Sequence, residues 1–384
     1  MYPALYLKSG RDRSILWGHP WVYSGAVARE ETHEAGAIVQ VCTNLGEVLG
    51  YGWLAPGRNL RCRIFHLGET SHLFDTDYWQ GRLEAAWQLR QQLMPLQPTP
   101  TTAYRLVHGE GDGLPGLIID LYADAAAIQA RAPGLEALLP VVQAFLVQKG
   151  LKHLAVQTEA DEQGRWLQGG VQALWFSEGG LEFGADLVGG QKTGYFLDQR
   201  ENRALVRRYA QGRKVLDVFS YAGGFGLHAL AGGAAQATSL DAMERAILQC
   251  QQNAERNGLT QNYEVLQADA FQHLRRLEHG RYDLIVLDPP AFTKSPKTVD
   301  QASRGYKDIN LSALRALPAG GLLFTFSCSQ HMPADLFRKV VFGAAVDAGR
   351  AVRILHQLHQ PVDHPVSLYH PEGEYLKGLV LEVG

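Results

Sequence analysis

The chain has 384 residues, of which 46% are hydrophobic and 20% charged, and its formal net charge is −3. This length exceeds one ordinary hydrophobic core and predicts two or three domains, while the near-neutral charge excludes a uniformly basic nucleic-acid binder. No run approaches the roughly 18 to 20 apolar residues of a transmembrane helix, and the first residues do not form a leader, so we expect a cytoplasmic protein.

Four cysteines are spread along the chain without any C-x-x-C pair: Cys42, Cys62, Cys250 and Cys328. This spacing argues against a zinc site and against a disulfide framework, and we expect no metal. Each cysteine is therefore either a small buried hydrophobe or, in one case, a nucleophile.

Residues 1–72 contain short strand-like runs at 4–7, 38–42, 48–53 and 60–65, separated by glycines, and predict a small β-rich domain. Basic and aromatic side chains alternate in it. Arg11 and Arg61 are candidate RNA contacts, because guanidinium groups hold phosphates while flat rings stack on bases. The alternative, that the aromatic residues form the domain core, stays open.

Residues 73–180 predict a small αβ domain. A helical pattern from Leu83 is broken at Met94-Pro95, and strands at 104–107, 117–122 and 154–158 surround a helix at 135–148. We find no catalytic constellation in this part of the chain. Its expected role is spacing or substrate contact.

A glycine-rich loop at 189–194 leads into Tyr195, Phe196, Asp198 and Arg200, and a helix is predicted over 200–209. The density of glycines, rings and charges favours a loop that lies against a ligand over a purely structural connection.

The strand 215–218 runs into a glycine turn and a helix, with Asp217, Tyr221, Gly223 and Gly224 in sequence. Glycines here let backbone amides and a helix N-terminus approach a ligand closely. The G-x-G-x-x-G pattern is missing, so a dinucleotide is not the first inference. Asp241 ends the next strand, 24 residues after Asp217, and suits a carboxylate that binds two ribose hydroxyls.

Two further acids follow short strands, namely Asp269 and Asp288. Residues 284–287 are four aliphatics that predict a buried parallel strand, which Pro289 and Pro290 must end because prolines donate no ladder hydrogen bond. Ligands of open α/β sheets bind at the carboxyl ends of strands. Four strand-end acids therefore predict one active-site rim, although any one alone is more often a helix cap or a surface residue.

Phe292 offers an aromatic face beside this rim, and Lys294 opens a basic loop that could grip phosphates or simply be solvated. The strand 322–326 is followed by Ser-Cys-Ser, which places Cys328 near the same rim. The apolar alternation at 376–383 predicts an edge hairpin that closes the sheet.

These motifs resemble those of S-adenosylmethionine-dependent methyltransferases with a Rossmann-like fold: D-x-F-S-Y-A-G-G-F-G at 217–226, Asp241, Asp269 and D-P-P-A-F at 288–292. With T-G-Y-F-L-D-Q-R at 193–200 and Ser-Cys-Ser at 327–329, the whole chain is similar to bacterial 23S ribosomal RNA cytosine-5 methyltransferases of the RlmI type. The resemblance implies an α/β fold with a PUA RNA-binding domain at 1–72, a small αβ central domain at 73–180 and a methyltransferase domain at 181–384.

The resemblance also implies roles for the site residues. The turn at Gly223 and Gly224 would cradle the methionine part of S-adenosylmethionine, Asp241 would hold the ribose, and Asp269 would face the adenine amino group. The remaining cofactor contacts implied are Tyr195, Phe196, Asp198, Arg200, Asp217, Tyr221 and Asp288. The substrate contacts implied are Pro289, Pro290, Phe292, Lys294, Arg11 and Arg61.

Carbon 5 of cytosine is a poor nucleophile, so a thiolate must first add to carbon 6, and Cys328 is the cysteine at the rim. Asp288 would hydrogen-bond the base, while the group that removes the carbon 5 proton is unassigned. One departure weakens this chemistry: many RNA cytosine-5 methyltransferases carry a second cysteine near the D-P-P motif, where this chain has Ala291.

Two alternatives therefore stay open, nitrogen methylation of an RNA base and an inactive RNA-binding or ribosome assembly factor. The expected partner is 23S ribosomal RNA or a large-subunit precursor, with 5-methylcytosine as the product. A homodimer is an open assembly state, and no membrane partner is expected.

Overall fold

The computed structural model describes residues 2–71, 73–161, 163–190, 192–293 and 295–384, and its chain divides into two compact units. The first unit comprises residues 1–176, 185–197 and 362–373, and the second comprises residues 177–184, 198–361 and 374–384. The chain thus passes from one unit to the other at residues 176, 184, 197, 361 and 373.

A six-stranded sheet in the order β2-β6-β5-β4-β1-β3 begins the first unit. Its strands are mostly antiparallel, with β1 and β4 running parallel. Their bounds are β1 (Ala4–Leu7), β2 (Trp21–Tyr23), β3 (Val27–Glu30), β4 (Ile38–Cys42), β5 (Val48–Leu54) and β6 (Leu60–Leu67), with the short helix α1 (Arg13–Leu16) between β1 and β2. Residues 4–67 thus have the β-rich structure that the sequence predicts for this part of the chain.

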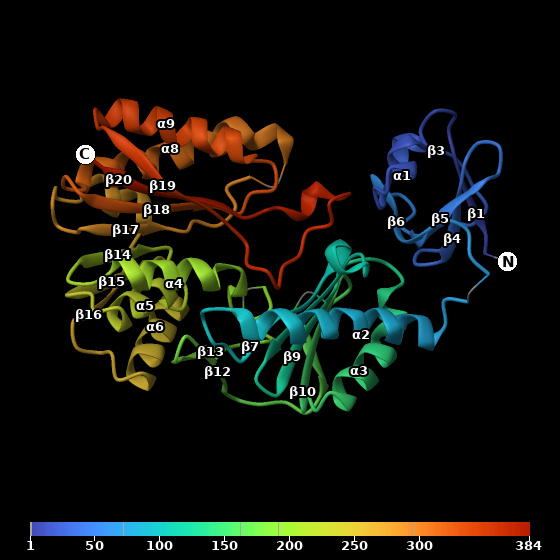
Figure 1. Ribbon diagram of the computed structural model, residues 1–384, viewed down its shortest axis with the longest axis horizontal. Helices are drawn as coiled ribbons and strands as arrows, with labels where there is room; N and C mark the ends of the chain where they lie inside the picture. The colour runs from blue at the N-terminus through green and yellow to red at the C-terminus, as the bar shows by residue number, and fades with distance from the viewer. Residues whose placement is uncertain (1, 72, 162, 191, 294) are drawn as a thin grey trace. The chain divides into compact units, whose positions relative to one another are not determined.

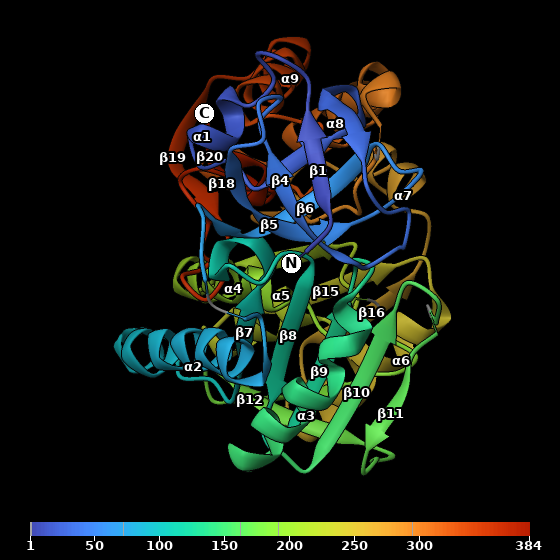
Figure 2. The same cartoon turned by 90° about the vertical axis from the view of Figure 1, so that its right-hand side faces the viewer.

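A five-stranded sheet in the order β11-β10-β9-β8-β7 follows in the same unit. The strands are β7 (Ala103–His108), β8 (Leu117–Tyr122), β9 (Ala125–Ala130), β10 (His153–Thr158) and β11 (Arg165–Gln168), and the helices are α2 (Thr76–Leu93) and α3 (Leu139–Gln148). Both helices pack on this sheet (Figure 2). Trp53 of the first sheet stacks on Trp79 of α2 with ring centroids 5.4 Å apart, so one core serves both sheets.

The second unit is built on a seven-stranded sheet in the order β16-β15-β14-β17-β18-β20-β19. Neighbours from β16 to β18 are parallel, and β20 is antiparallel to β18 and to β19. The strands are β14 (Lys214–Val218), β15 (Gln236–Asp241), β16 (Tyr263–Gln267), β17 (Leu284–Leu287), β18 (Gly321–Ser327), β19 (Val352–His359) and β20 (Lys377–Val383). A small sheet of β12 (Leu174–Glu178) and β13 (Leu181–Ala185) precedes it in the chain.

Helices cover both faces of the seven-stranded sheet (Figure 1). They are α4 (Arg200–Tyr209), α5 (Gly224–Ala231), α6 (Glu244–Arg256), α7 (Ala270–Arg275), α8 (Val299–Ala316) and α9 (Ala334–Ala348). Alternate strand residues belong to two cores: Leu216 and Ile285 pack with α8 and α9, whereas Val215 and Val286 pack with α4 and α5. Burial on both faces explains why β17 is a continuous aliphatic run.

The expected end of the strand at Asp288 is confirmed, since β17 stops at Leu287. The edge hairpin expected at 376–383 corresponds to the antiparallel pair of β20 and β19, which stands at one edge of the sheet. Within this pair β20 is the inner strand, and the outermost strand is β19, which the sequence did not reveal. Half of the eight residues of β19 are polar, namely Arg353, His356, Gln357 and His359, and they do not alternate regularly with the aliphatic ones, so the strand carries a weak hydrophobic pattern.

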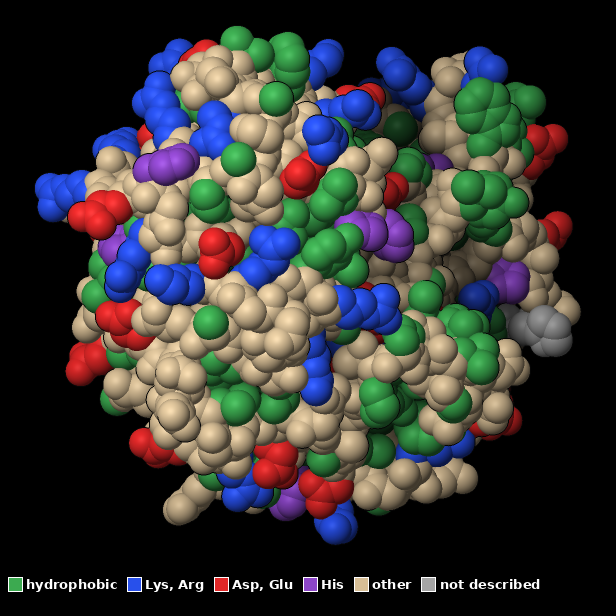
Figure 3. Space-filling model, turned by 60° about the vertical axis from the view of Figure 1, so that its left-hand side comes forward, with side chains coloured by type: hydrophobic (Ala, Val, Ile, Leu, Met, Phe, Trp, Pro, Cys, Tyr) green, Lys and Arg blue, Asp and Glu red, His purple; other side chains and the backbone are tan. Residues whose placement is uncertain are grey.

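On the face drawn in Figure 3, Lys and Arg side chains are interspersed with Asp and Glu. This mixture agrees with the net charge of −3 and does not produce a broad field of one sign on that face. Within the described part of the chain, we find no helix with the length and apolarity needed to cross a bilayer.

Candidate active site

The carboxyl ends of the parallel strands β14, β15, β16, β17 and β18 meet at one edge of the second unit's sheet. Asp217 lies in β14 and Asp241 ends β15, while Asp269, Asp288 and Cys328 follow β16, β17 and β18. The structure therefore brings to one sheet edge the four acids and the cysteine predicted from separate motifs. Such an edge is where open α/β sheets bind ligands.

The turn between β14 and α5 has an unusual backbone. Phe219 and Tyr221 have φ values of 64° and 50°, and Gly223, the N-cap of α5, has a φ of 72°. Left-handed conformations cost free energy in residues other than glycine, and they concentrate at ligand sites. The positive φ of Gly223 would strain any other residue, and a Cβ there would also lie 2.3 Å from the hydroxyl of Tyr263, so the turn favours glycine at this position.

Asp217 is completely buried beneath this turn. Its Oδ2 accepts hydrogen bonds from the Gly226 amide at 3.0 Å and the Ser239 hydroxyl at 3.3 Å, whereas its Oδ1 has no partner among the described residues. Burial is the largest cause that raises the pKa of Asp217 to about 7, and the charge of Asp288 adds to it. The orphaned oxygen is an acceptor held below the glycine turn.

Asp241 is oriented by the backbone. Its Oδ2 accepts from the Tyr221 amide and its Oδ1 from the Met243 amide, each at 3.0 Å. A carboxylate has about four lone-pair sites, so two further donors can still be accepted. This geometry suits the predicted contact with two ribose hydroxyls.

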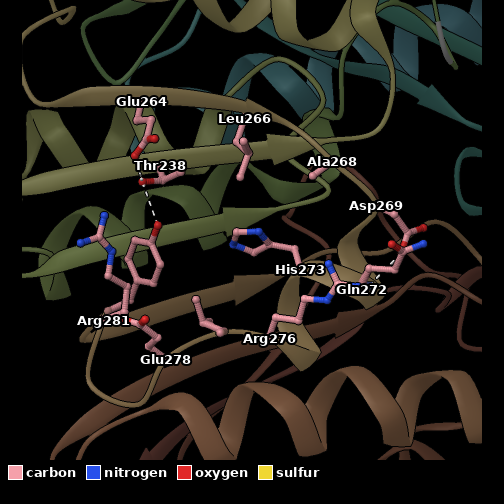
Figure 4. Close-up of a pocket in the computed structure, with 12 residues that line it drawn as sticks. Thr238, Glu264, Leu266, Ala268, Asp269, Gln272, His273, Arg276, Glu278 and Arg281 are labelled. Carbon is pink, nitrogen blue, oxygen red and sulfur yellow. Dashed lines mark hydrogen bonds between the residues drawn. The ribbon is translucent and has the colours of Figure 1, made fainter.

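Asp269 is the N-cap of α7, where its Oδ1 accepts from the Gln272 amide at 2.8 Å. It is exposed at one side of a pocket of about 450 Å³ between α7 and the strands β15 and β16. Figure 4 shows His273 of α7 directed into this pocket, with Thr238 and Glu264 on the strands. The helix-cap alternative and the ligand-facing prediction for Asp269 are thus compatible.

Asp288 is held by a chain of side-chain amides. Asn202 Nδ2 donates to Gln199 Oε1 at 2.6 Å, and Gln199 Nε2 donates to Asp288 Oδ1 at 2.9 Å. Gln199 and Asn202 are both buried and were missed as site residues. Gln199 lies within the T-G-Y-F-L-D-Q-R segment and Asn202 follows it. The sequence predicts ligand contact for four other residues of this region, so proximity to them was the signal that could have identified Gln199 and Asn202.

The remaining residues of that segment fall into both units. Asp198 belongs to the second unit, where its Oδ2 accepts from the Tyr375 hydroxyl at 2.7 Å, and Arg200 is completely buried there with its Nε 3.1 Å from Glu201. Tyr195 and Phe196 belong to the first unit. In that unit Tyr195 packs on Phe176 with ring centroids 4.9 Å apart, and the Lys192 ammonium lies 4.2 Å from the Phe196 ring centroid.

The D-P-P-A-F segment at 288–292 lies partly buried beside the rim. Pro289 is buried and Pro290 is exposed. Phe292 is half-buried and packs on Tyr306 and Phe271, with ring centroids 4.6 and 5.8 Å away. Part of the Phe292 ring is therefore used for packing, which limits the stacking surface expected from it.

Cys328 is carried by a turn fixed by buried hydroxyls. Tyr306 of α8 bonds the hydroxyls of Ser327 and Ser329, with O–O distances of 3.0 and 2.9 Å. Cys328 itself is half-exposed, and its Sγ lies 3.9 Å from the carbonyl oxygen of Pro289. The thiol and the D-P-P motif, 39 residues apart in the chain, are thus neighbours.

The other three cysteines, Cys42, Cys62 and Cys250, are buried. Burial is the largest cause that raises the pKa of each of their thiols, for Cys250 to about 12. Since the thiolate is the reactive form, Cys328 is the cysteine best placed for nucleophilic chemistry.

The two arginines predicted to contact RNA outside the rim differ in exposure and in pairing. Arg11 is exposed, whereas Arg61 donates to Glu30 at 2.8 Å with only 19% of its side chain exposed. Arg58 and Arg63 are likewise paired, with Glu159 and Glu110. The positive charge expected near β6 is therefore largely balanced by acids. Lys294 lies outside the described residues.

The acceptors of the rim fit the cofactor that the resemblance implies. S-adenosylmethionine presents an ammonium group, two ribose hydroxyls and an adenine amino group, all of which are donors. The site offers the orphaned Oδ1 of Asp217, the oriented carboxylate of Asp241 and the exposed Asp269. No cluster of metal-binding side chains occurs among the residues that the structure describes.

Comparison with protein families gives two matches. Residues 112–365 match the model of S-adenosylmethionine-dependent methyltransferases, and residues 5–67 match that of PUA-like domains. The expected α/β fold with a PUA-like N-terminal domain is thereby confirmed.

Full-length relatives are also found. The chain is 40% identical to ribosomal RNA large subunit methyltransferase I of Erwinia tasmaniensis over 99% of each chain, and 38% identical to that of Salmonella typhi over 100% of this chain and 98% of the relative. The solved structure of a SAM-dependent methyltransferase from Streptococcus mutans has a TM-score of 0.86 at 23% identity, over 99% of this chain and 100% of its own. A second solved methyltransferase, in complex with SAH, has a TM-score of 0.85 at 23% identity over the same shares.

Proposed function

This chain belongs to the S-adenosylmethionine-dependent methyltransferases, and from that membership we propose that it methylates carbon 5 of a cytosine in 23S ribosomal RNA through a Cys328 adduct. The relatives named ribosomal RNA large subunit methyltransferase I support the RNA substrate, at 40% and 38% identity over nearly the whole chain. The PUA-like match at 5–67 supports RNA binding by the first residues. The proposal places the enzyme in the cytoplasm, where ribosomal RNA is processed.

The observation that carries the carbon 5 chemistry is the position of Cys328. Its half-exposed thiol lies 3.9 Å from the Pro289 carbonyl, beside the acid of the D-P-P motif. A nitrogen acceptor needs no thiol, whereas carbon 5 of cytosine reacts only after a nucleophile has added at carbon 6. A cysteine held at the rim by Tyr306 therefore favours carbon 5.

The proposed reaction begins with the addition of Cys328 to the base. The Cys328 thiolate forms a bond to carbon 6, and the displaced electron pair makes carbon 5 nucleophilic while Asp288 hydrogen-bonds the base. When bound, S-adenosylmethionine would supply the methyl group: carbon 5 forms the new carbon–methyl bond, the methyl–sulfur bond breaks, and S-adenosylhomocysteine is left. The carbon 5 proton then passes to solvent water, its electron pair restores the double bond, and the bond between carbon 6 and the sulfur breaks to release the Cys328 thiolate. Gln199 keeps Asp288 directed at the base during these steps.

The cofactor contacts are part of the same proposal. Asp241 would bind the ribose hydroxyls, Asp269 the adenine amino group, and the turn at Gly223 the methionine part. Tyr195, Phe196, Asp198 and Arg200 would order the segment that covers the cofactor, and Arg11 would contact RNA. We also propose a division into an RNA-binding domain at 1–72, a central domain at 73–180 and a methyltransferase domain at 181–384.

The variant Cys328→Ala tests the adduct. We expect it to bind S-adenosylmethionine with unchanged affinity in calorimetry and to lose methyl transfer to 23S ribosomal RNA by at least about 10³-fold, because the nucleophilic step is lost. Cys42→Ala, at a buried cysteine of the first unit, is the control and should keep its activity. Full transfer by Cys328→Ala would refute the adduct.

Nitrogen methylation is the second candidate, because Ala291 stands in the D-P-P segment where a product-releasing cysteine was expected. Nucleoside mass spectrometry and bisulfite sequencing of the methylated RNA separate the two candidates. A 5-methylcytosine signal supports the thiol chemistry, and a mark on a base nitrogen supports the alternative.

A further inference from the structure

We infer that Lys377 is a positioning residue for Cys328: its ammonium group lies beside the cysteine turn and favours the thiolate over the thiol. This inference rests on the proposed function, in which Cys328 is the nucleophile. Lys377 lies on β20, and no sequence motif links this strand to the site.

The strand register brings the two residues together. Lys377 is the first residue of β20 and pairs with Ser327, the last residue of β18, so Cys328 follows immediately after its partner. Lys377 Nζ donates to the carbonyl oxygen of Ser329 at 2.7 Å. The ammonium group is therefore anchored to the residue after Cys328, across a turn of three residues.

The partly buried position of Lys377 limits the screening of its charge by water. Lys377 is half-buried, and burial lowers its pKa to about 8, while the negative forms of Cys328 and Glu374 act in the opposite direction. Lys377 thus carries a positive charge at neutral pH and loses it as the pH rises through about 8. A positive charge within about 4 to 6 Å lowers the pKa of an acidic group by roughly one to three units.

Other titratable groups face this corner of the sheet. His359 of β19 is the strand partner of Lys377. The charge of Cys328 contributes to the raised pKa of Tyr306, whose largest cause is burial. Asp288 precedes Pro289, whose carbonyl oxygen contacts the Cys328 thiol. Glu374 lies just before β20 in the chain. Among these described groups Lys377 is the one that hydrogen-bonds the cysteine turn through a group that is cationic at neutral pH.

A purely structural role for Lys377 is the competing explanation, since its hydrogen bond to Ser329 would hold the turn whatever its charge. Two substitutions separate the explanations. Lys377→Gln keeps a donor for the Ser329 carbonyl but removes the charge, and Lys377→Arg keeps the charge with a different shape.

The test is the pH dependence of Cys328 alkylation by iodoacetamide in the full-length protein, followed by mass spectrometry of the peptide that contains Cys328. The three buried cysteines provide an internal background. We expect Lys377→Gln to raise the midpoint of the alkylation curve by about one pH unit, or roughly tenfold less thiolate at pH 7. Lys377→Arg should keep the midpoint low, and Lys339→Gln at an exposed site of α9 should not move it.

An unshifted midpoint in a folded Lys377→Gln protein would overturn the inference, with far-ultraviolet circular dichroism as the check of folding. If Lys377→Gln does not fold, Lys377→Arg decides: a midpoint equal to that of the unaltered protein supports the charge, and a raised midpoint contradicts it. The alkylation readout does not require methyl transfer. A shifted midpoint together with an active Cys328→Ala protein would therefore refute the proposed function and leave this inference standing.

Discussion

At the scale of single residues, Asp217 is the acid of the site whose ionisation is most strongly opposed by burial. Its carboxylate has no exposed surface, and burial raises its pKa to about 7 from an ordinary value of 3.8. Between these two pH values the folded protein holds a proton that the unfolded chain releases. The free energy of unfolding therefore falls as the pH rises from about 4 to about 7, by up to about 1.4 kcal/mol per pH unit.

The variant Asp217→Asn removes this titration. We expect its free energy of unfolding, relative to that of the unaltered protein, to increase by about 3 kcal/mol between pH 4.5 and pH 7. Urea unfolding of the cofactor-free protein at a series of pH values measures this difference, with the exposed Asp300→Asn of α8 as the control. A difference that is constant with pH would show that Asp217 is ionised throughout this range.

The sequence predicted the rim residues but not the residues that orient them. Asp241, Asp288 and Cys328 follow directly after strands, so local patterns place them at the sheet edge. Tyr306 and Lys377 reach Cys328 through helix packing and antiparallel register, from positions 22 and 49 residues away in the chain. A local pattern carries no information on such partners.

At the scale of elements, a buried ion cluster joins β12 to two helices. Glu178 at the end of β12 receives two hydrogen bonds from Arg203 of α4, at 2.6 and 2.8 Å, and His228 Nε2 of α5 lies 3.2 Å from its Oε1 without hydrogen-bond geometry. Burial raises the pKa of Glu178, but the charge and hydrogen bonds of Arg203 are the main influences that outweigh burial and bring the pKa to about 2. Burial lowers the pKa of His228, so Glu178 and Arg203 are the ionised pair of the cluster at neutral pH.

Replacement of Glu178 by Gln should lower the free energy of unfolding by about 3–5 kcal/mol at pH 7, because Arg203 is left buried without its counter-ion. The loss should shrink as the pH falls from about 4.5 towards 2, where the unaltered carboxylate is protonated too. Denaturant unfolding measures it. Glu182→Gln on β13 is the control, since Glu182 and Arg256 are 46% and 49% exposed and such pairs contribute at most about 1 kcal/mol. Equal effects of the two changes would contradict the prediction.

The elements predicted well are those with one dominant pattern. The helix expected over 200–209 matches α4, and β17 matches its aliphatic run. The alanine-rich β9 and the polar β19 were missed. Alanine has little strand preference, so β9 shows no strand pattern of its own although it forms a hairpin with β8 and also pairs with β10. β19 depends on its pairing with β20 rather than on a periodic pattern.

At the scale of the whole molecule, residues 362–373 leave the second unit between β19 and β20 and belong to the first. Within the first unit, Asp363 accepts from the Arg105 amide at 2.9 Å and Arg90 donates to the Asp363 carbonyl at 2.9 Å. His370 packs on Trp21 with ring centroids 4.3 Å apart. This segment is therefore an integral part of the first unit's structure.

Leu368 is 89% exposed within that segment, and a protease site engineered there offers a test. We expect the fragment that begins at residue 369 to stay bound after cleavage, because β20 pairs with β18 and β19 along all seven of its residues. Size-exclusion chromatography should give one peak, and denaturing gels two bands. Separation of the fragment under native conditions would show that the β20 pairings are weak.

The inner position of β20 also bears on how the polypeptide folds as it is made. Of the seven strands in its sheet, β20 is the last to be translated, yet it lies between two strands that are translated earlier. Until it is available, β18 has an unpaired edge, and β19, whose pairing in the described sheet is with β20, has no strand to hold it there. Lys377 is also missing from the cysteine turn. Nascent chains therefore have an open edge at β18, which can pair wrongly or bind chaperones, and they acquire a complete active site only with β20.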